Sequence, residues 1–264
     1  MQSKTNAHTL AGKIFTVELS DWAEQASGSV LVRLGDTVIL ATAVMGGVRE
    51  GIDYFPLSVE YEEKYYATGK ILGSRFVKRE TRPSEEAILA GRVIDRSIRP
   101  RFNSRMRSEV QVIVTVLSVD GENDPDIPAL LASSLALSLS DIPWQGPIAG
   151  VRVARKEKEF ILNPSYEERE VSDLETIVSG TRERINMLEA GAKEAGEEEF
   201  AKAVEWSFSY VEELIAFQDR IIKEHGKDKR EGSYVSIPPE LEKLIRSEFV
   251  SLIEEAVYQP GKKA

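Results

Sequence analysis

A basic island in the chain supplies the residue types that bind a polyanion. Residues 75–107 contain ten Lys and Arg and only four Asp and Glu, a local net charge of +6. The whole 264-residue chain carries −10, so the remaining residues hold −16. A single basic region on an acidic body concentrates anions at one place, and this distribution favours a focused anion site over a generally adhesive surface.

The first part of the island combines one aromatic side chain with several cations. Phe76 stands beside Lys78, Arg79 and Arg82 in a stretch without helical or strand periodicity. Cations neutralise phosphates, and stacking of a base on an aromatic ring contributes about 1–3 kcal/mol. We therefore expect residues 62–82 to form a long loop that contacts single-stranded nucleic acid, the alternative being a solvated charged loop.

The second part of the island is a predicted helix that begins after Ser84 and ends near Ile98. The Ser84 side chain can cap free amides, and the following glutamates suit the positive end of the helix dipole. Arg92, Arg96 and Arg99 fall within an arc of about 60°, opposite the apolar face. They either line a channel for RNA or phosphate or form ion pairs with neighbouring carboxylates.

Several other chemistries find no support in the sequence. The chain has no Cys and two distant His, which excludes thiolate chemistry and paired-histidine metal sites. It contains neither a phosphate-binding Gly-rich loop ending in Gly-Lys-Ser/Thr nor a Gly-x-Gly-x-x-Gly turn. Asp124 and Asp126 are conceivable magnesium ligands, but we expect them to form a turn and cap the next helix.

The order of the expected strands and helices around the island predicts an α+β fold in which helices cover a mixed sheet. Gly35-Asp36 joins two strands as a hairpin, and Pro56 places the next strand at an edge or an end. The continuous apolar run 110–119 predicts a strand buried on both faces. Small residues in 127–140 predict a helix that packs closely on the sheet. The predicted strands are 13–19, 29–34, 37–45, 54–61, 110–119, 148–154, 159–162, 174–179 and 185–188.

The last quarter of the chain predicts a small all-α unit. Helices are expected over 192–225 and 239–258, joined by a charged linker at 226–236. Trp206, Phe208 and Tyr210 could stack on bases, but packing of an amphipathic helix is the expectation we favour. We place domains at 1–190 and 191–264. No apolar run is long enough to span a bilayer and no secretory signal is visible, so we expect a soluble, cytoplasmic protein without a membrane partner.

Two motifs around the island resemble the polynucleotide phosphorylase family. Residues 61–85 read YEEKYYATGKILGSRFVKRETRPSE and residues 91–102 read GRVIDRSIRPRF. Shorter matches occur at 53–57, 123–127, 136–143 and 162–164, and the likeness covers roughly residues 10–190. The resemblance implies an N-terminal RNase PH-like core followed by an all-α domain. It assigns RNA-binding roles to Phe76, Lys78, Arg79, Arg82, Arg92, Arg96 and Arg99.

For the complete enzyme, the resemblance implies 3′-to-5′ degradation of single-stranded RNA. Inorganic phosphate would attack the RNA end and release nucleoside diphosphates, with Mg²⁺, in a ring-shaped homotrimer. Residues 75–79 are one residue longer than the usual motif, and Thr81 replaces a Gly. A second RNase PH-like core and further RNA-binding modules are absent from these 264 residues.

The resemblance predicts that this part of the enzyme holds no catalytic centre. The turn at 121–125 contains acids and a proline where active cores bind phosphate, and the segment 163–168 lacks the expected Asp pair. We therefore expect no catalytic residue and no metal ligand here, with the Mg²⁺ site in the absent second core. The alternative function is a stand-alone, non-catalytic RNA-binding or ring-scaffold subunit.

Overall fold

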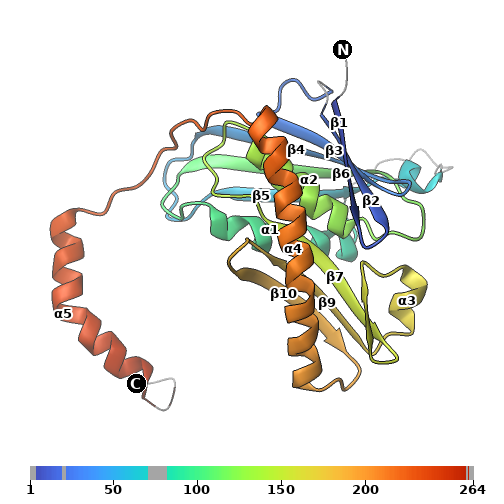
Figure 1. Cartoon of the computed structure of the whole chain (residues 1–264). Helices are drawn as coiled ribbons and strands as arrows, with labels where there is room; N and C mark the ends of the chain where they lie inside the picture. The colour runs from blue at the N-terminus through green and yellow to red at the C-terminus, as the bar shows by residue number, and fades with distance from the viewer. Residues whose placement is uncertain (1–3, 20–21, 71–81, 260, 262–264) are drawn as a thin grey trace.

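Two β-sheets enclose two helices in the body of the protein (Figure 1). The computed structural model describes residues 4–19, 22–70, 82–259 and 261. One sheet has the strand order β1-β2-β3-β4-β6-β5 and the other β10-β9-β7-β8. Helix α1 lies between β5 and β10, and α2 lies between β3–β4 and β7. This arrangement confirms the predicted α+β class, with two sheets in place of one.

The elements follow the chain in an order close to the predicted one. The strands are β1 (Lys4–Leu10), β2 (Lys13–Leu19), β3 (Gly28–Leu34), β4 (Thr37–Val48), β5 (Leu57–Glu63), β6 (Ser108–Ser118), β7 (Ala149–Lys156), β8 (Glu159–Leu162), β9 (Leu174–Gly180) and β10 (Ile185–Ala192). The helices are η1 (Tyr65–Thr68), α1 (Glu85–Ile98), η2 (Arg99–Arg101), α2 (Asp126–Leu139), α3 (Tyr166–Glu170), α4 (Glu197–His225) and α5 (Pro239–Val257).

The six-stranded sheet agrees with the predicted hairpin and corrects two other expectations. Leu34 pairs with Thr37 across the turn, and β5 lies at the sheet edge, parallel to β6. Strand β1 was not predicted, because a polar edge strand that buries little gives almost no apolar pattern. In β6, burial alternates along the strand, so the expectation of burial on both faces is wrong.

Helix α2 packs closely because its residues are small. Residues 127–139 are all buried between the two sheets, as the Ala- and Ser-rich sequence predicted. A Cβ added at Gly28 of β3 would lie 2.1 Å from the Ala136 carbonyl oxygen, so only glycine allows this approach. This close approach lies in the last turn of α2 and holds that end of the helix against β3.

Helix α1 begins as predicted, but the segment before it is more ordered than expected. The Ser84 hydroxyl accepts the Ala87 amide at 3.0 Å, as an N-cap does. The described part of the expected loop 62–82 includes the end of β5 and the 3-10 helix η1, which corrects that expectation. Strand β5 contacts α1, and η1 contacts β6.

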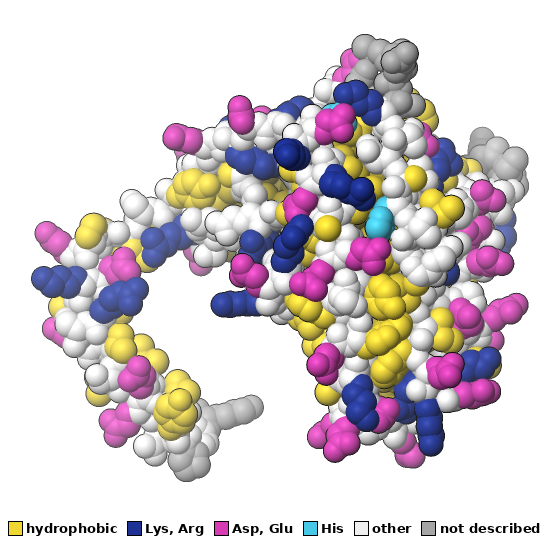
Figure 2. Space-filling view, in the orientation of Figure 1, with side chains coloured by type: hydrophobic (Ala, Val, Ile, Leu, Met, Phe, Trp, Pro, Cys, Tyr) yellow, Lys and Arg dark blue, Asp and Glu magenta, His cyan; other side chains and the backbone are white. Residues whose placement is uncertain are grey.

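The C-terminal helices occupy different surroundings. Helix α4 packs against β7 and β9, and Trp206 contacts Phe160 and Tyr210 with ring centroids 5.5 and 5.0 Å apart. Helix α5 stands apart from the body and buries none of its residues, and its apolar side chains lie on the surface (Figures 1 and 2). The boundary at residue 190 stays a prediction. Across the described ranges, no helix is both long and apolar enough to cross a membrane.

The linker before α5 is bound to the body along its length. The Arg230 amide donates to the Asp141 carbonyl at 2.8 Å, and the Val235 amide donates to the Arg105 carbonyl at 2.9 Å. The Lys229 ammonium donates to three carbonyl groups at the C-terminal end of α2, at 2.7–2.9 Å. A cation there complements the negative end of the helix dipole.

Candidate functional site

A cavity of about 1330 Å³ lies at the edge of the six-stranded sheet, between β5, η1 and α1. Its floor and walls combine apolar side chains such as Ile88 and Val119 with the ring of Tyr65. Charged side chains of both signs surround them. Of these three elements α1 belongs to the basic island, which also contributes Arg82 to the lining.

The carboxylates that line this cavity all have partners within the chain. Glu60 accepts from the Gln111 amide at 2.9 Å, and Glu63 accepts from the Ser84 hydroxyl at 2.8 Å. Glu62 lies 3.0 Å from the Lys64 ammonium. Asp95 lies 2.7 Å from the Arg99 guanidinium. Glu62 and Asp95 are therefore paired with cations, whereas Glu60 and Glu63 are hydrogen-bonded by uncharged groups and keep their negative charge.

Three cations of the lining lack such compensation. Lys70, Arg82 and Arg92 line the cavity and are exposed. Within the part of the chain that the structure describes, none of their side chains has an ion pair or a hydrogen bond. Positive charge without an internal partner, next to an apolar wall, is suited to an anionic ligand.

Arg99 differs from the other arginines of the island because it ties two elements together. Its guanidinium donates to both Asp95 oxygens and also to the Phe55 and Leu57 carbonyls, at 3.3 and 3.0 Å. The group also lies over the Phe55 ring, 5.9 Å from its centroid. Arg99 thus joins α1 to the start of β5. Of the two alternatives that the sequence left open, Arg99 follows the second, an ion pair with a neighbouring carboxylate.

The remaining predicted site residues divide into two groups. Arg96 is exposed on α1, one turn beyond Arg92 and outside the cavity lining. Phe76, Lys78 and Arg79 lie outside the described residues. The structure therefore brings Arg82, Arg92 and Arg99 around one cavity, and their proposed contact with RNA stays a prediction. Tyr65 is a lining residue that sequence reasoning missed, since only the tertiary contact of η1 with β6 shows its place.

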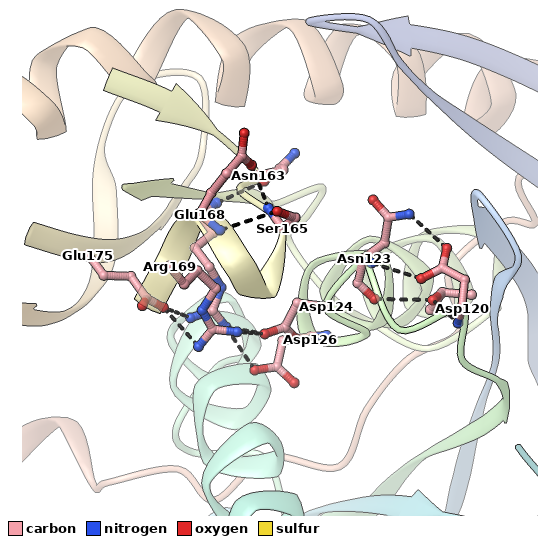
Figure 3. A network of polar contacts seen from close by, with 11 residues as sticks. Asp120, Asn123, Asp124, Asp126, Asn163, Ser165, Glu168, Arg169 and Glu175 are labelled. Atoms are coloured by element: carbon pink, nitrogen blue, oxygen red, sulfur yellow. Dashed lines mark hydrogen bonds and ion pairs between the residues drawn. The ribbon is translucent and has the colours of Figure 1, made fainter. Parts of the chain in front are cut away.

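A buried ion-pair network lies at the N-terminus of α2 (Figure 3). Arg152 of β7, whose side chain is 7% exposed, contacts Asp124 at 3.2 Å and Asp126 at 3.0 Å, and also pairs with Glu175. Arg169 of α3 pairs with Asp124 and lies 3.0 Å from Glu175. Three carboxylates thus occupy both guanidinium groups, leaving neither arginine to bind phosphate.

Burial changes the acidity of the groups in this network. It raises the pKa of Asp126 to about 7, and the charge of Asp124 adds to the rise while the two arginines oppose it. Burial, together with the same two aspartates, raises the pKa of the Tyr61 hydroxyl far above its usual value. Tyr61 lines the cavity, so its ring separates that cavity from the network.

The segments that should hold catalytic groups have structural roles instead. Ser165 and Glu168 form a capping box that starts α3, and the Asn163 side chain accepts the Arg152 amide at 2.9 Å. Burial would raise the pKa of Asp120, but hydrogen bonds from Asn123 and Glu122 hold it at about 2. Asp124 accepts the Asp126 amide at 2.9 Å, as expected for a turn, whereas Pro125 is the N-cap.

The described residues do not form a magnesium site. No group of three or more His, Asp or Glu among them could hold a metal ion. The carboxylates that come closest together, Asp124 and Asp126, already have guanidinium partners in Arg152 and Arg169. A cation there would have to displace a buried arginine.

Two family models match the chain over most of its length. The 3′ exoribonuclease family, domain 1, matches residues 13–143, and the 3′ exoribonuclease family, domain 2, matches residues 146–210. The second match includes the first half of α4, so the match continues beyond the predicted domain boundary. Both sheets and the two enclosed helices lie almost entirely within the matched residues.

Two curated relatives whose sequences are about 50% identical to this chain carry the same name. The polyribonucleotide nucleotidyltransferase of Bacillus cytotoxicus is 50% identical over 237 residues, 90% of this chain and 33% of its own length. That of Geobacillus kaustophilus is 48% identical over 255 residues, 97% of this chain and 35% of its own length. The chain thus spans about a third of the length of the curated relatives it matches.

Solved structures share the fold at low sequence identity. Rice (Oryza sativa) Rrp46 aligns with a TM-score of 0.61 at 16% identity, covering 84% of this chain and 94% of that protein. A chain of the Archaeoglobus fulgidus exosome with RNA bound to the active site aligns with a TM-score of 0.60 at 19% identity, covering 79% and 87%. These likenesses establish the RNase PH-like fold of the body.

Proposed function

Since the chain belongs to the 3′ exoribonuclease family, we propose that it is the N-terminal part of a phosphorolytic 3′-to-5′ exoribonuclease that degrades mRNA. The complete enzyme would use inorganic phosphate to cleave RNA into nucleoside diphosphates. The observation that carries this proposal is the identity of about half with polyribonucleotide nucleotidyltransferases over at least 90% of the chain.

In this proposal the chain binds RNA through the basic island. Arg82, Arg92 and Arg96 are exposed, and no described residue neutralises them, so they are available for phosphates. The proposal also includes three residues outside the described ranges, whose roles rest on the sequence only. They are a ring for base stacking, Phe76, and two further cations, Lys78 and Arg79. Arg99 acts indirectly, because its donors are used to hold α1 on β5.

The catalytic centre and the Mg²⁺ ion belong, in the same proposal, to the part of the enzyme outside these 264 residues. The paired network around Arg152 supports this assignment, because it leaves no free cation for phosphate at the N-terminus of α2. We further propose a cytoplasmic homotrimeric ring in which three such RNA surfaces surround one strand, so that their contacts act together.

The test of RNA binding compares an arginine of α1 with the arginine that follows the end of that helix. Fluorescence anisotropy of labelled oligo(A) is measured over a salt series with the wild-type chain, Arg96→Ala and Arg99→Ala. Loss of Arg96 should weaken binding and make the dependence on salt shallower by about 0.7 in log–log slope, the value for one phosphate contact with a single strand. Unchanged affinity and slope for Arg96→Ala would refute the assignment of this face to RNA.

A further inference from the structure

Strand β10 is the outermost strand of the second sheet, and no described residue pairs with its far edge (Figure 1). The Lys193 amide donates to the Asp173 carbonyl at 2.8 Å, and the register of β10 against β9 is constant over residues 187–192. Hydrogen-bonded residues alternate along an antiparallel strand, so every second residue of β10 directs its main-chain groups to the free edge. These residues are Leu188, Ala190 and Ala192.

The side chains of this edge leave room for another strand. Leu188, Ala190 and Ala192 are uncharged and exposed, whereas proteins usually protect an edge strand with charges, Pro or a covering loop. Gly191 lines a cavity of about 500 Å³, and a Cβ added there would meet no other atom within 4 Å. A strand added to this edge can therefore place a side chain in the cavity, which is how strand addition gains specificity.

The charges beside the edge indicate which kind of strand fits. Four carboxylates in residues 188–198 are exposed and form no ion pair with any described residue. They belong to Glu189, Glu194, Glu197 and Glu198. The only cation in this stretch, Lys193, donates to the Glu170 carbonyl at 3.1 Å and keeps its charge. Residues 188–198 therefore carry a net charge of −3.

The remaining charged groups of the cavity lining already form ion pairs. They are Arg152, Arg169, Asp173 and Glu175. A basic segment complements the charge of residues 188–198, whereas RNA or the same edge of a second copy would bring further negative charge and be repelled.

We propose that the free edge of β10 binds an extended segment of a protein partner, rich in Lys or Arg, as a further strand of the second sheet. Main-chain hydrogen bonds would supply the affinity, and the exposed carboxylates the preference for a basic segment. None of the residues that form this edge belongs to the basic island. The proposal is therefore independent of the RNA contacts assigned above.

The strand offers matched variants. Ala190→Pro removes an amide that faces the free edge, and Pro is tolerated at such positions of an edge strand. Ala190→Thr keeps the amide and suits a strand, so it is the control. Glu189→Gln combined with Glu194→Gln removes two of the carboxylates. Its control, Glu205→Gln combined with Glu212→Gln, removes two exposed carboxylates of α4 that also form no ion pair with a described residue. Circular dichroism and urea denaturation establish that each variant is folded.

Fluorescence anisotropy on the 264-residue chain tests the proposal with a labelled peptide in which Lys alternates with Val and Thr. One control peptide has Glu in place of Lys, and another has methylated backbone amides. Only the first peptide should bind. Ala190→Pro should weaken its binding about fivefold or more, as expected for a lost ladder hydrogen bond. The Glu189 and Glu194 double variant should weaken it about two- to twentyfold, the range for two surface ion pairs. Both control variants should bind as the wild type does.

Amide hydrogen exchange supplies a second measurement, because an added strand should slow the exchange of the Leu188, Ala190 and Ala192 amides. If the Lys peptide does not bind, or binds Ala190→Pro as tightly as the wild type, the proposal is wrong. Equal binding of the methylated peptide would show that charge alone attracts it and would refute strand addition. A dimer in light scattering that Ala190→Pro abolishes would assign the edge to a second copy and also refute the proposal. Each of these failures leaves the RNA assignment standing, because that assignment is tested on Arg96.

Discussion

The Arg152 guanidinium lies 3.0 Å from the Asp126 carboxylate, and this contact joins the second sheet to the first turn of α2. Arg152 belongs to β7, whereas Asp126 begins the helix that lies between the sheets. The same guanidinium also meets Asp124 and Glu175. One buried arginine therefore fixes three carboxylates from two elements and a turn.

Removal of Arg152 should be strongly destabilising. Arg152→Met leaves three carboxylates facing Arg169 alone, and breaking a buried ion pair in this way costs about 3–5 kcal/mol. Urea denaturation followed by circular dichroism measures the change in the free energy of unfolding. The control is Arg182→Met, which breaks the exposed pair with Asp219 and should cost less than about 1 kcal/mol. Equal effects of the two substitutions would contradict the structural role of the network.

The raised pKa of Asp126 predicts a specific pH dependence of stability. Between its unfolded pKa, near 4, and its folded pKa of about 7, the native state holds more protons at this site than the unfolded state. The contribution of Asp126 to stability is therefore fully present at low pH and is lost as pH rises toward 7. Asp126→Asn cannot titrate, so its unfolding free energy should fall less than that of the wild type between pH 5 and 8. Parallel pH profiles would refute the shift.

Arg99 and Arg96 should affect different properties, although they are only three residues apart. Arg99→Ala removes the contacts with Asp95 and with two carbonyls of the β5 region, and should lower the free energy of unfolding by about 1–3 kcal/mol. Arg96→Ala should change stability by less than about 0.5 kcal/mol, because the side chain is exposed. Thermal and urea denaturation test both. If Arg96→Ala lowered the free energy of unfolding more than Arg99→Ala, the role of Arg99 in holding α1 to β5 would be contradicted.

The predicted loop contacts are separable by their response to salt. Replacing Lys78 and Arg79 together by Ala should weaken oligo(A) binding and flatten its salt dependence by about 0.7 in slope per lost phosphate contact. Phe76→Ala should lower the affinity by about 1–3 kcal/mol at most and leave the slope unchanged, because stacking is not ionic. Anisotropy over a salt series distinguishes the two. If the double variant kept the affinity and slope of the wild type, the loop would be only a solvated charged segment.

The isolated chain should not carry out phosphorolysis. The arginines at the N-terminus of α2 are paired with carboxylates, and the segment 163–168 forms a helix start in place of a carboxylate pair. Incubation with poly(A), phosphate and Mg²⁺ should release no ADP above a blank without protein. Phosphate-dependent ADP release would place a catalytic centre within these 264 residues.

The class of fold and the position of the basic island were predictable from the sequence, because the signals for both are local. Alternating apolar residues, the Gly35-Asp36 turn and the Ser84 cap are local signals, and each acts within a few residues. They therefore predicted the hairpin, the start of α1 and the small-residue helix α2. The polar edge strand β1 and the five-residue helix α3 gave no comparable pattern and were missed.

The ion pairs and hydrogen bonds of the arginines could not be predicted from the sequence, because they join residues that are distant in the chain. Arg92, Arg96 and Arg99 share one face in the sequence pattern, but Arg99 meets carbonyls more than 40 residues away and the others do not. Arg152 and Glu175 belong to different strands, and no local signal pairs them with Asp124. An ion pair forms between whatever groups the packed elements bring together, so the division of the arginines between structure and binding depends on the fold as a whole.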